Sequence, residues 1–227
     1  MSFNSDAVTT LTFDSYSTLV DVDAAEKALA ARVDDPEPVS KLWRSRSIEY
    51  TLVSNHIDAY QTFYEMNRDA LTYALDAHSV DLPDEEREEI LSVYHELDVF
   101  DDVREGMERL RDAGYDLYVV SNGNPEMLDS MVDHADIGGL LEDTISADEV
   151  ETFKPDAEIY RHAAARTGTP IEEMAHAAAL WFDVQGAQHA GMQGIWMNRK
   201  DTPWEPFDGE PSLTVETIHD IADELDA

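Results

Sequence analysis

The chain passes from a β-rich run to a carboxylate within Val8-Thr9-Thr10-Leu11-Thr12-Phe13-Asp14-Ser15-Tyr16-Ser17-Thr18-Leu19. In an open α/β sheet, ligands bind outside the carboxyl ends of the strands, and an aspartate placed there can act as a nucleophile. Taken alone, Asp14 is more often a solvated charge or the cap of a turn. The polar groups that follow the other predicted strands therefore decide how Asp14 is interpreted.

Three further segments deliver polar side chains to strand ends or loops. Residues 115–120 predict a buried strand that ends at Ser121-Asn122-Gly123, Phe153-Lys154-Pro155 opens a predicted helix, and residues 177–182 predict a strand that ends at Asp183. Because the carboxyl ends of parallel strands meet at one edge, we expect these groups to share a crevice with Asp14. A lysine buried beside two aspartates keeps both ionised at neutral pH, and the Ser and Asn side chains can donate hydrogen bonds to an anion.

The chain divides into a helical segment and an alternating segment. Residues 21–98 predict helices without a convincing strand, whereas strands and helices alternate from residue 99 and end with a helix over residues 215–225. This order predicts an α/β protein with a Rossmann-like, doubly wound parallel sheet. We expect a core domain of residues 1–20 and 99–227, with an all-helical cap domain of residues 21–98 inserted after the first strand.

The order of these segments resembles the haloacid dehalogenase superfamily, and within it the L-2-haloacid dehalogenases, over nearly the whole chain. The motifs that carry the resemblance are Phe13-Asp14-Ser15-Tyr16-Ser17-Thr18-Leu19, Ser121-Asn122-Gly123-Asn124, Lys154-Pro155-Asp156 with Tyr160, and Asp183-Val184-Gln185-Gly186-Ala187. The most specific is Leu42-Trp43-Arg44-Ser45-Arg46-Ser47-Ile48-Glu49-Tyr50-Thr51, which is similar to the signature of the dehalogenase cap.

The resemblance implies a two-step reaction without a metal or other cofactor. Asp14 attacks the α-carbon of a short L-2-haloacid and forms an ester, while Arg44 and Asn122 receive the halide. Water polarised by Asp183, in the field of Lys154, then hydrolyses the ester and releases a D-2-hydroxyacid. The side chains expected to bind this small-molecule substrate are Tyr16, Thr18, Ile48, Phe63, Ser121, Tyr160 and Phe182.

Two departures from the family patterns leave alternatives open. Superfamily phosphatases carry a second aspartate two residues after the nucleophile to protonate the leaving alkoxide, and this chain has Tyr16 there. Ala178-Ala179-Leu180 occupies the position of a Ser-Ser-Asn run in the dehalogenases and of metal-binding acids in the phosphatases. The alternatives are a superfamily phosphatase with relaxed motifs and a relative without turnover that acts as a binding protein.

The composition is strongly acidic. The 227 residues include 15 Lys and Arg against 50 Asp and Glu, which gives a formal net charge of −35 at pH 7. This balance argues against nucleic acid and anionic membranes as partners. Four residues are lysines, and such a composition resembles proteins of salt-in halophiles, in which salt screens the repulsion between acidic groups.

Further observations bound the location and the partners. The chain has no cysteine, no apolar stretch of membrane-spanning length and no basic segment followed by an apolar one at its start, so we expect a cytoplasmic protein. Its eight histidines show no metal-ligand spacing and are expected to be structural or to face solvent. Relatives of the family are commonly homodimers, which makes a homodimer one expected assembly.

Overall fold

A six-stranded parallel sheet forms the centre of the computed structural model, which describes residues 2–227. Its strands are β1 (Thr10–Phe13), β2 (Asp116–Ser121), β3 (Asp143–Ser146), β4 (Met174–Ala178), β5 (Gln193–Met197) and β6 (Leu213–Val215). They lie in the order β3-β2-β1-β4-β5-β6, so the chain winds outward from β1 in both directions. The predicted Rossmann-like, doubly wound fold is therefore confirmed.

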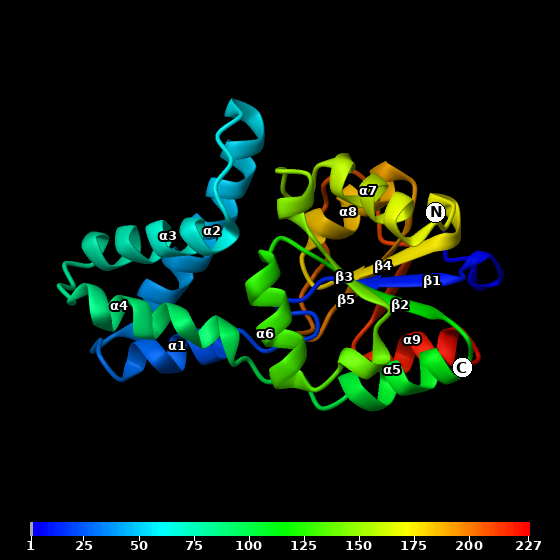
Figure 1. The fold of residues 1–227 in the computed structure, drawn as a ribbon, viewed down its shortest axis with the longest axis horizontal. Helices are drawn as coiled ribbons and strands as arrows, with labels where there is room; N and C mark the ends of the chain where they lie inside the picture. Colours follow the sequence, from blue (N-terminus) through cyan, green and yellow to red (C-terminus); the bar gives the residue numbers. More distant parts are fainter. Residues whose placement is uncertain (1) are drawn as a thin grey trace.

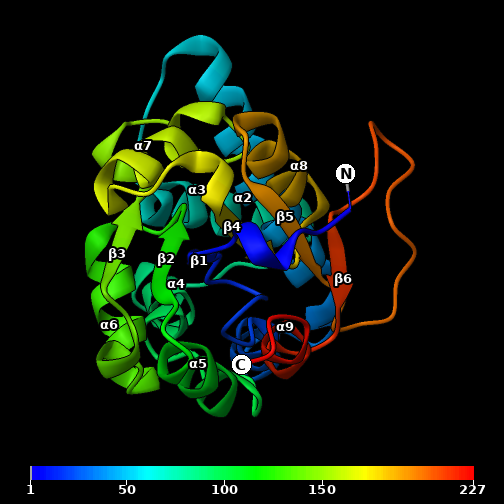
Figure 2. The same cartoon turned by 90° about the vertical axis from the view of Figure 1, so that its right-hand side faces the viewer.

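Helices cover both faces of the sheet (Figures 1 and 2). One face carries α7 (Ala157–Thr167) and α8 (Trp181–Ala190), and the other carries α5 (Val103–Asp112), α6 (Pro125–Ala135) and α9 (Ile218–Glu224). All four residues of β1 are buried between these two layers. A parallel strand covered on both faces is expected to be continuously apolar or internally hydrogen-bonded, as Thr10-Leu11-Thr12-Phe13 is.

Four helices lie between β1 and α5 in the sequence and to one side of the sheet in Figure 1. They are α1 (Asp23–Ala30), α2 (Pro36–Ile57), α3 (Phe63–Ala77) and α4 (Asp84–Leu91). A capping box begins α3, because Thr62 accepts a hydrogen bond from the Glu65 backbone and the Glu65 carboxylate accepts one from the Thr62 backbone. The fully buried Trp43 donates its indole hydrogen to the Asn67 carbonyl at 2.9 Å and so joins α2 to α3.

Short 3-10 helices complete the secondary structure of residues 2–227. They are η1 (Ser5–Ala7), η2 (Ser92–His95), η3 (Gly138–Leu140), η4 (Ala147–Glu149) and η5 (Ile171–Glu173). None of the helices in this described part of the chain combines the length and the apolar character needed to cross a lipid bilayer.

Some predicted element boundaries are wrong. The strand predicted over residues 177–182 ends at Ala178, and α8 begins at Trp181, which places Asp183 in the first turn of a helix. The helix predicted to open at Phe153-Lys154-Pro155 begins at Ala157, where the Asp156 side chain caps it. Residue 215 belongs to the edge strand β6, and α9 begins only after the capping box at Thr217.

Candidate active site

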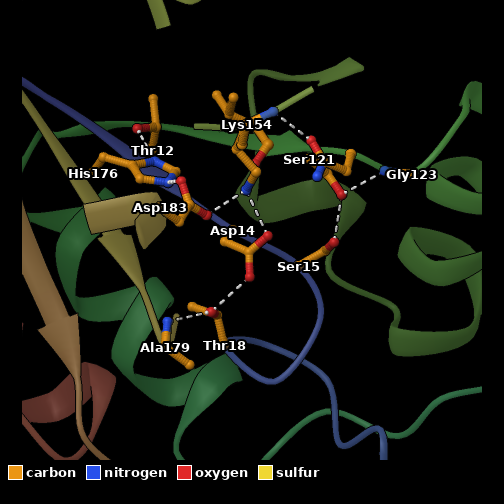
Figure 3. Close-up of polar contacts among 12 residues, drawn as sticks. Thr12, Asp14, Ser15, Thr18, Ser121, Gly123, Lys154, His176, Ala179 and Asp183 are labelled. Carbon is orange, nitrogen blue, oxygen red and sulfur yellow. Dashed lines mark hydrogen bonds and ion pairs between the residues drawn. The ribbon is translucent and has the colours of Figure 1, made fainter. Parts of the chain in front are cut away.

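Asp14 lies at the carboxyl end of the central strand. Its backbone N–H continues the sheet pairing with a hydrogen bond to the Ala177 carbonyl at 2.9 Å, so the position of the residue is set by β4. The side chain is almost fully buried, and both of its oxygens accept hydrogen bonds (Figure 3). Lys154 Nζ donates to Oδ1 at 2.6 Å, and Thr18 Oγ1 donates to Oδ2 at 2.9 Å.

Lys154 connects two carboxylates that come from different strand ends. Its ammonium lies 2.6 Å from Asp14 Oδ1 and 2.6 Å from Asp183 Oδ2, and it also donates to the Val120 carbonyl at 3.0 Å. The Lys154 backbone N–H donates to Asn122 Oδ1 at 2.9 Å, which ties its loop to the end of β2. Burial alone would lower the pKa of Lys154, but the two carboxylates outweigh it and raise this pKa, so the side chain is an ammonium.

The two carboxylates have different surroundings. Asp183 Oδ1 accepts hydrogen bonds from Tyr160 at 2.6 Å and from His176 Nε2 at 3.0 Å. Burial alone would raise the pKa of Asp183, but Lys154 and His176 outweigh it and hold this pKa well below its ordinary range. Burial raises the pKa of Asp14, against the opposing charge of Lys154. Asp183 is therefore the more readily ionised of the two, and such a difference between paired carboxylates is typical of sites that assign them different roles.

A cavity of about 90 Å³ opens in front of Asp14. Nine of the twelve side chains expected at the site line it, namely Asp14, Tyr16, Arg44, Ile48, Phe63, Asn122, Lys154, Phe182 and Asp183. The other lining residues are Ser17, Val22, Ser47, Thr51, Asn67, Tyr94 and Leu180. Because Arg44 and Ile48 come from α2 and Phe63 from α3, the helical segment supplies one wall and the strand ends supply the other.

The remaining three expected residues, Thr18, Ser121 and Tyr160, do not line this cavity. Thr18 donates to Asp14 and accepts a hydrogen bond from the Ala179 backbone, and Tyr160 donates to Asp183. Ser121 Oγ is hydrogen-bonded to Ser15 Oγ at 2.6 Å and to a backbone N–H of the turn that follows it. Their hydroxyls are hydrogen-bonded to protein groups and so support the two carboxylates and the turn after β2, and direct contact with a substrate stays a prediction.

Comparison with known proteins adds to this geometry. Residues 8–191 match the family model for haloacid dehalogenase-like hydrolases. The chain belongs to this family. It is similar to (S)-2-haloacid dehalogenase 4A of Burkholderia cepacia, with 32% identity over 201 residues that cover 88% of this chain and 87% of that protein. It is also similar to an (S)-2-haloacid dehalogenase of Pseudomonas putida, with 27% identity over 216 residues and 95% of each chain covered. The solved L-2-haloacid dehalogenase RSc1362 superposes with a TM-score of 0.94 at 28% identity, covering 97% of this chain and 99% of that one.

In this haloacid dehalogenase-like hydrolase, Arg44 approaches the cavity from α2. Its guanidinium donates a long hydrogen bond to Ser17 Oγ at 3.4 Å and lies 3.6 Å from Asp23 Oδ1, so its partners hold it loosely. A third of the Arg44 side chain is exposed. A guanidinium has five N–H donors, which leaves some of them free for an anion in the cavity.

Two polar groups of the cavity wall have no hydrogen-bond partner. They are the Tyr16 hydroxyl and the Asn67 side-chain nitrogen, both buried. Ser47 Oγ donates to Asn67 Oδ1 at 2.6 Å and holds the Asn67 amide against the cavity. Neither atom is exposed in the cavity, so each carries the cost of an unpaired buried polar group, about 1–3 kcal/mol. No sequence motif pointed to Asn67 as a site residue, because a single amide side chain within a predicted helix does not indicate a function.

His176 is the functional candidate that the sequence interpretation missed. The spacing of the histidines predicts that they are structural or face solvent, but the His176 ring is buried and lies against Asp183 within the site. The available signal was a titratable side chain in the middle of Met174-Ala175-His176-Ala177-Ala178, an otherwise apolar strand. Among residues 2–227, no group of three or more His, Cys, Asp or Glu side chains has an arrangement that could hold a metal ion.

Proposed function

We propose that this hydrolase converts short L-2-haloacids to D-2-hydroxyacids through an ester on Asp14. The observation that carries the proposal is the carboxylate of Asp14, held by Lys154 at 2.6 Å on the floor of a cavity whose walls bring Arg44 and apolar side chains together. The (S)-2-haloacid dehalogenase relatives support this assignment over nearly the full chain.

The first half-reaction is a displacement at carbon. An Asp14 oxygen attacks the α-carbon from the side opposite the halogen, the carbon–halogen bond breaks, and the halide leaves with the bonding electrons. Arg44 and Asn122 receive the halide, which needs no proton to leave. The apolar wall of Tyr16, Ile48, Phe63 and Phe182 excludes water from the reacting atoms.

The second half-reaction restores Asp14. A water molecule attacks the Asp14 carbonyl carbon and gives its proton to Asp183, which is the more acidic carboxylate and so is ionised when the water arrives. The bond between the Asp14 carbonyl carbon and the ester oxygen of the substrate then breaks. That oxygen takes up the proton from Asp183, and the hydroxyacid leaves. Thr18, Tyr160 and Ser121 position the groups behind the cavity.

Bromide release from L-2-bromopropionate in molar KCl, followed by ion chromatography, tests this function. Wild type should release bromide and D-2-hydroxypropionate in equal amounts, and Asp14→Asn should release neither. Asp116→Asn, at the exposed start of β2, is the matched control and should behave like wild type. Turnover by Asp14→Asn would contradict the assignment of the nucleophile.

The apolar segment 178–180 favours a second candidate, a relative that is alkylated by haloacids without turning over. Ala178 is fully buried and Leu180 lines the cavity, so neither offers a side-chain hydrogen bond to a water molecule near the ester. In that case one equivalent of bromide per chain is released and the intact mass retains the alkyl group on Asp14. Mg²⁺-dependent hydrolysis of p-nitrophenyl phosphate would instead favour the phosphatase alternative.

We further propose that residues 21–98 act as a cap domain over a core of residues 1–20 and 99–227, and that two copies form a homodimer. The location of α1–α4 to one side of the sheet and their share of the cavity wall support the cap. Sedimentation equilibrium tests the assembly, and a monomer at micromolar concentration would exclude the dimer.

We also propose that the protein works in a salt-rich cytoplasm. The support is the net charge of −35, since 1 M salt shortens the screening distance to about 3 Å and relieves repulsion between acidic groups. The urea concentration at the midpoint of unfolding should rise with KCl up to molar concentrations. A midpoint that stays constant or falls with added KCl would contradict this proposal.

A further inference from the structure

We propose, on the basis of the function proposed above, that His176 is a positioning residue for ester hydrolysis: from within β4 it holds Asp183 in the orientation that takes the proton of the attacking water. No other histidine of residues 2–227 is hydrogen-bonded to Asp14, Lys154 or Asp183. Its imidazole acts through Asp183 and does not line the cavity.

The ring of His176 is held at both nitrogens. Nε2 lies 3.0 Å from Asp183 Oδ1, Nδ1 lies 2.8 Å from Thr12 Oγ1, and the residue is fully buried (Figure 3). The ring also packs edge-on against Tyr160, with 5.5 Å between the ring centres and 73° between the planes. Thr12, His176 and Asp183 therefore form a continuous chain from β1 through β4 to α8.

The chemistry of the partners fixes the direction of the hydrogen bond between His176 and Asp183. An ionised carboxylate only accepts, so the hydrogen between Asp183 and His176 belongs to Nε2. The Thr12 hydroxyl can donate to Nδ1 or accept from it, and its other neighbour is the Ala175 carbonyl at 3.3 Å. Both ring nitrogens thus have a hydrogen-bond partner, and these partners keep the imidazole in one orientation.

Three side chains outside the segment that precedes Asp183 orient its carboxylate. Tyr160 and His176 donate to Oδ1, and Lys154 donates to Oδ2, so three different elements hold the plane of the carboxylate. The preceding segment, Ala178-Ala179-Leu180, has no side-chain donor or acceptor that could orient either Asp183 or the water. Orientation of the base therefore falls to Tyr160, His176 and Lys154, and a displacement of about 1 Å is enough to slow such a step.

Loss of His176 should affect the two half-reactions differently. Ester formation uses Asp14, which His176 does not touch, whereas ester hydrolysis uses Asp183. Removing the His176 donor also removes one of the groups that lower the pKa of Asp183, while Lys154, Tyr160 and Asp14 continue to face this carboxylate. The acid limb of ester hydrolysis should therefore move to higher pH in a variant without this donor.

The test compares His176→Phe, His176→Gln and Thr12→Val with wild type by rapid-quench intact-mass analysis of the Asp14 ester formed from L-2-bromopropionate. In His176→Phe the ester should form within about twofold of the wild-type rate and decay at least about tenfold more slowly, with its acid limb at higher pH. His176→Gln keeps a side-chain N–H and should recover most of the decay rate. Thr12→Val, which leaves His176 unanchored at Nδ1, should fall between. His189→Gln on the exposed part of α8 is the control and should match wild type.

The outcomes distinguish the two proposals. No ester and no bromide in wild type would overturn the proposed function itself. Ester that forms in wild type and decays at the same rate in His176→Phe would overturn the role of His176 alone, and so would an equal slowing of formation and decay. Loss of folded structure in all three variants, measured by circular dichroism, would assign His176 to stability and also overturn the role.

Discussion

Replacing Lys154 with methionine should both lower the free energy of unfolding and leave Asp14 protonated and therefore unreactive. The side chain is 2% exposed and its ammonium makes all three of its hydrogen bonds within the site, two of them to carboxylates at 2.6 Å. Removing one partner of a buried ion pair costs about 3–5 kcal/mol, because the remaining charge is left uncompensated. If the same free energy opposes ionisation of Asp14, its acid dissociation constant falls by about 10²–10⁴-fold, and below the resulting pKa most molecules lack the ionised nucleophile.

The pH dependence of this loss follows from linkage. In Lys154→Met the two carboxylates bind protons more tightly in the folded than in the unfolded state, so the folded state holds more protons. The free energy of unfolding then decreases as the pH rises, by up to about 1.4 kcal/mol per pH unit for each carboxylate. The variant should therefore lie nearest to wild type in acid and furthest from it at neutral pH.

Urea unfolding at several pH values and constant salt measures the stability, and bromide release measures the nucleophile. Lys41→Met is the matched control, since Lys41 lies on the surface of α2 and pairs only with Glu37 one turn away. It should show neither effect. A Lys154→Met protein with wild-type stability at neutral pH, or with wild-type bromide release, would refute the reasoning that one ammonium sustains both carboxylates.

Three further predictions follow from the geometry of the site. Arg44→Ala should lower kcat/KM by about 10²–10³-fold and should change the unfolding midpoint little, because the Arg44 side chain is partly exposed. Arg46 does not line the cavity, so Arg46→Ala should keep its activity. Equal losses of activity in both variants would contradict a role of Arg44 in binding the halide. Gly186→Ala should cost about 1–3 kcal/mol of stability, because its Cβ would lie 2.6 Å from Pro155 Cβ and 2.8 Å from the Tyr160 hydroxyl. Gly139→Ala, with nothing within 4 Å of its Cβ, is the control, and similar unfolding midpoints for the two variants would show that α8 has room to shift. Because burial raises the pKa of Asp14 and its protonation removes the nucleophile, kcat/KM should fall as the pH is lowered through a pKa above 3.8; a rate that stays constant down to this pH would count against it.

The sequence alone was sufficient to predict that Asp14, Lys154 and Asp183 lie together in the fold. These residues are up to 169 positions apart, yet each follows or flanks the carboxyl end of a parallel strand, and such ends converge on one edge. The fold class followed from the same alternation of strands and helices. Both inferences depend only on topology, which the order of apolar and polar segments expresses.

Side-chain direction could not be obtained in this way. Thr18 and Tyr160 belong to the motifs, but whether a hydroxyl faces the cavity or a neighbouring carboxylate depends on rotamers that no spacing encodes. The apolar run before Asp183 predicts a strand or a buried helix equally well, which is why the start of α8 at Trp181 was missed. His176 was overlooked because its partner lies on another element and becomes visible only when β4 and α8 are packed.

The fate of water oxygen in a single turnover tests the covalent role of Asp14 most directly. With the enzyme in excess over L-2-bromopropionate in H₂¹⁸O, attack at the Asp14 carbonyl carbon should leave one ¹⁸O in the peptide that contains Asp14 and none in the D-2-hydroxypropionate. Label in the hydroxyacid, with Asp14 unlabelled, would show that water attacks the substrate carbon itself and would contradict the ester mechanism.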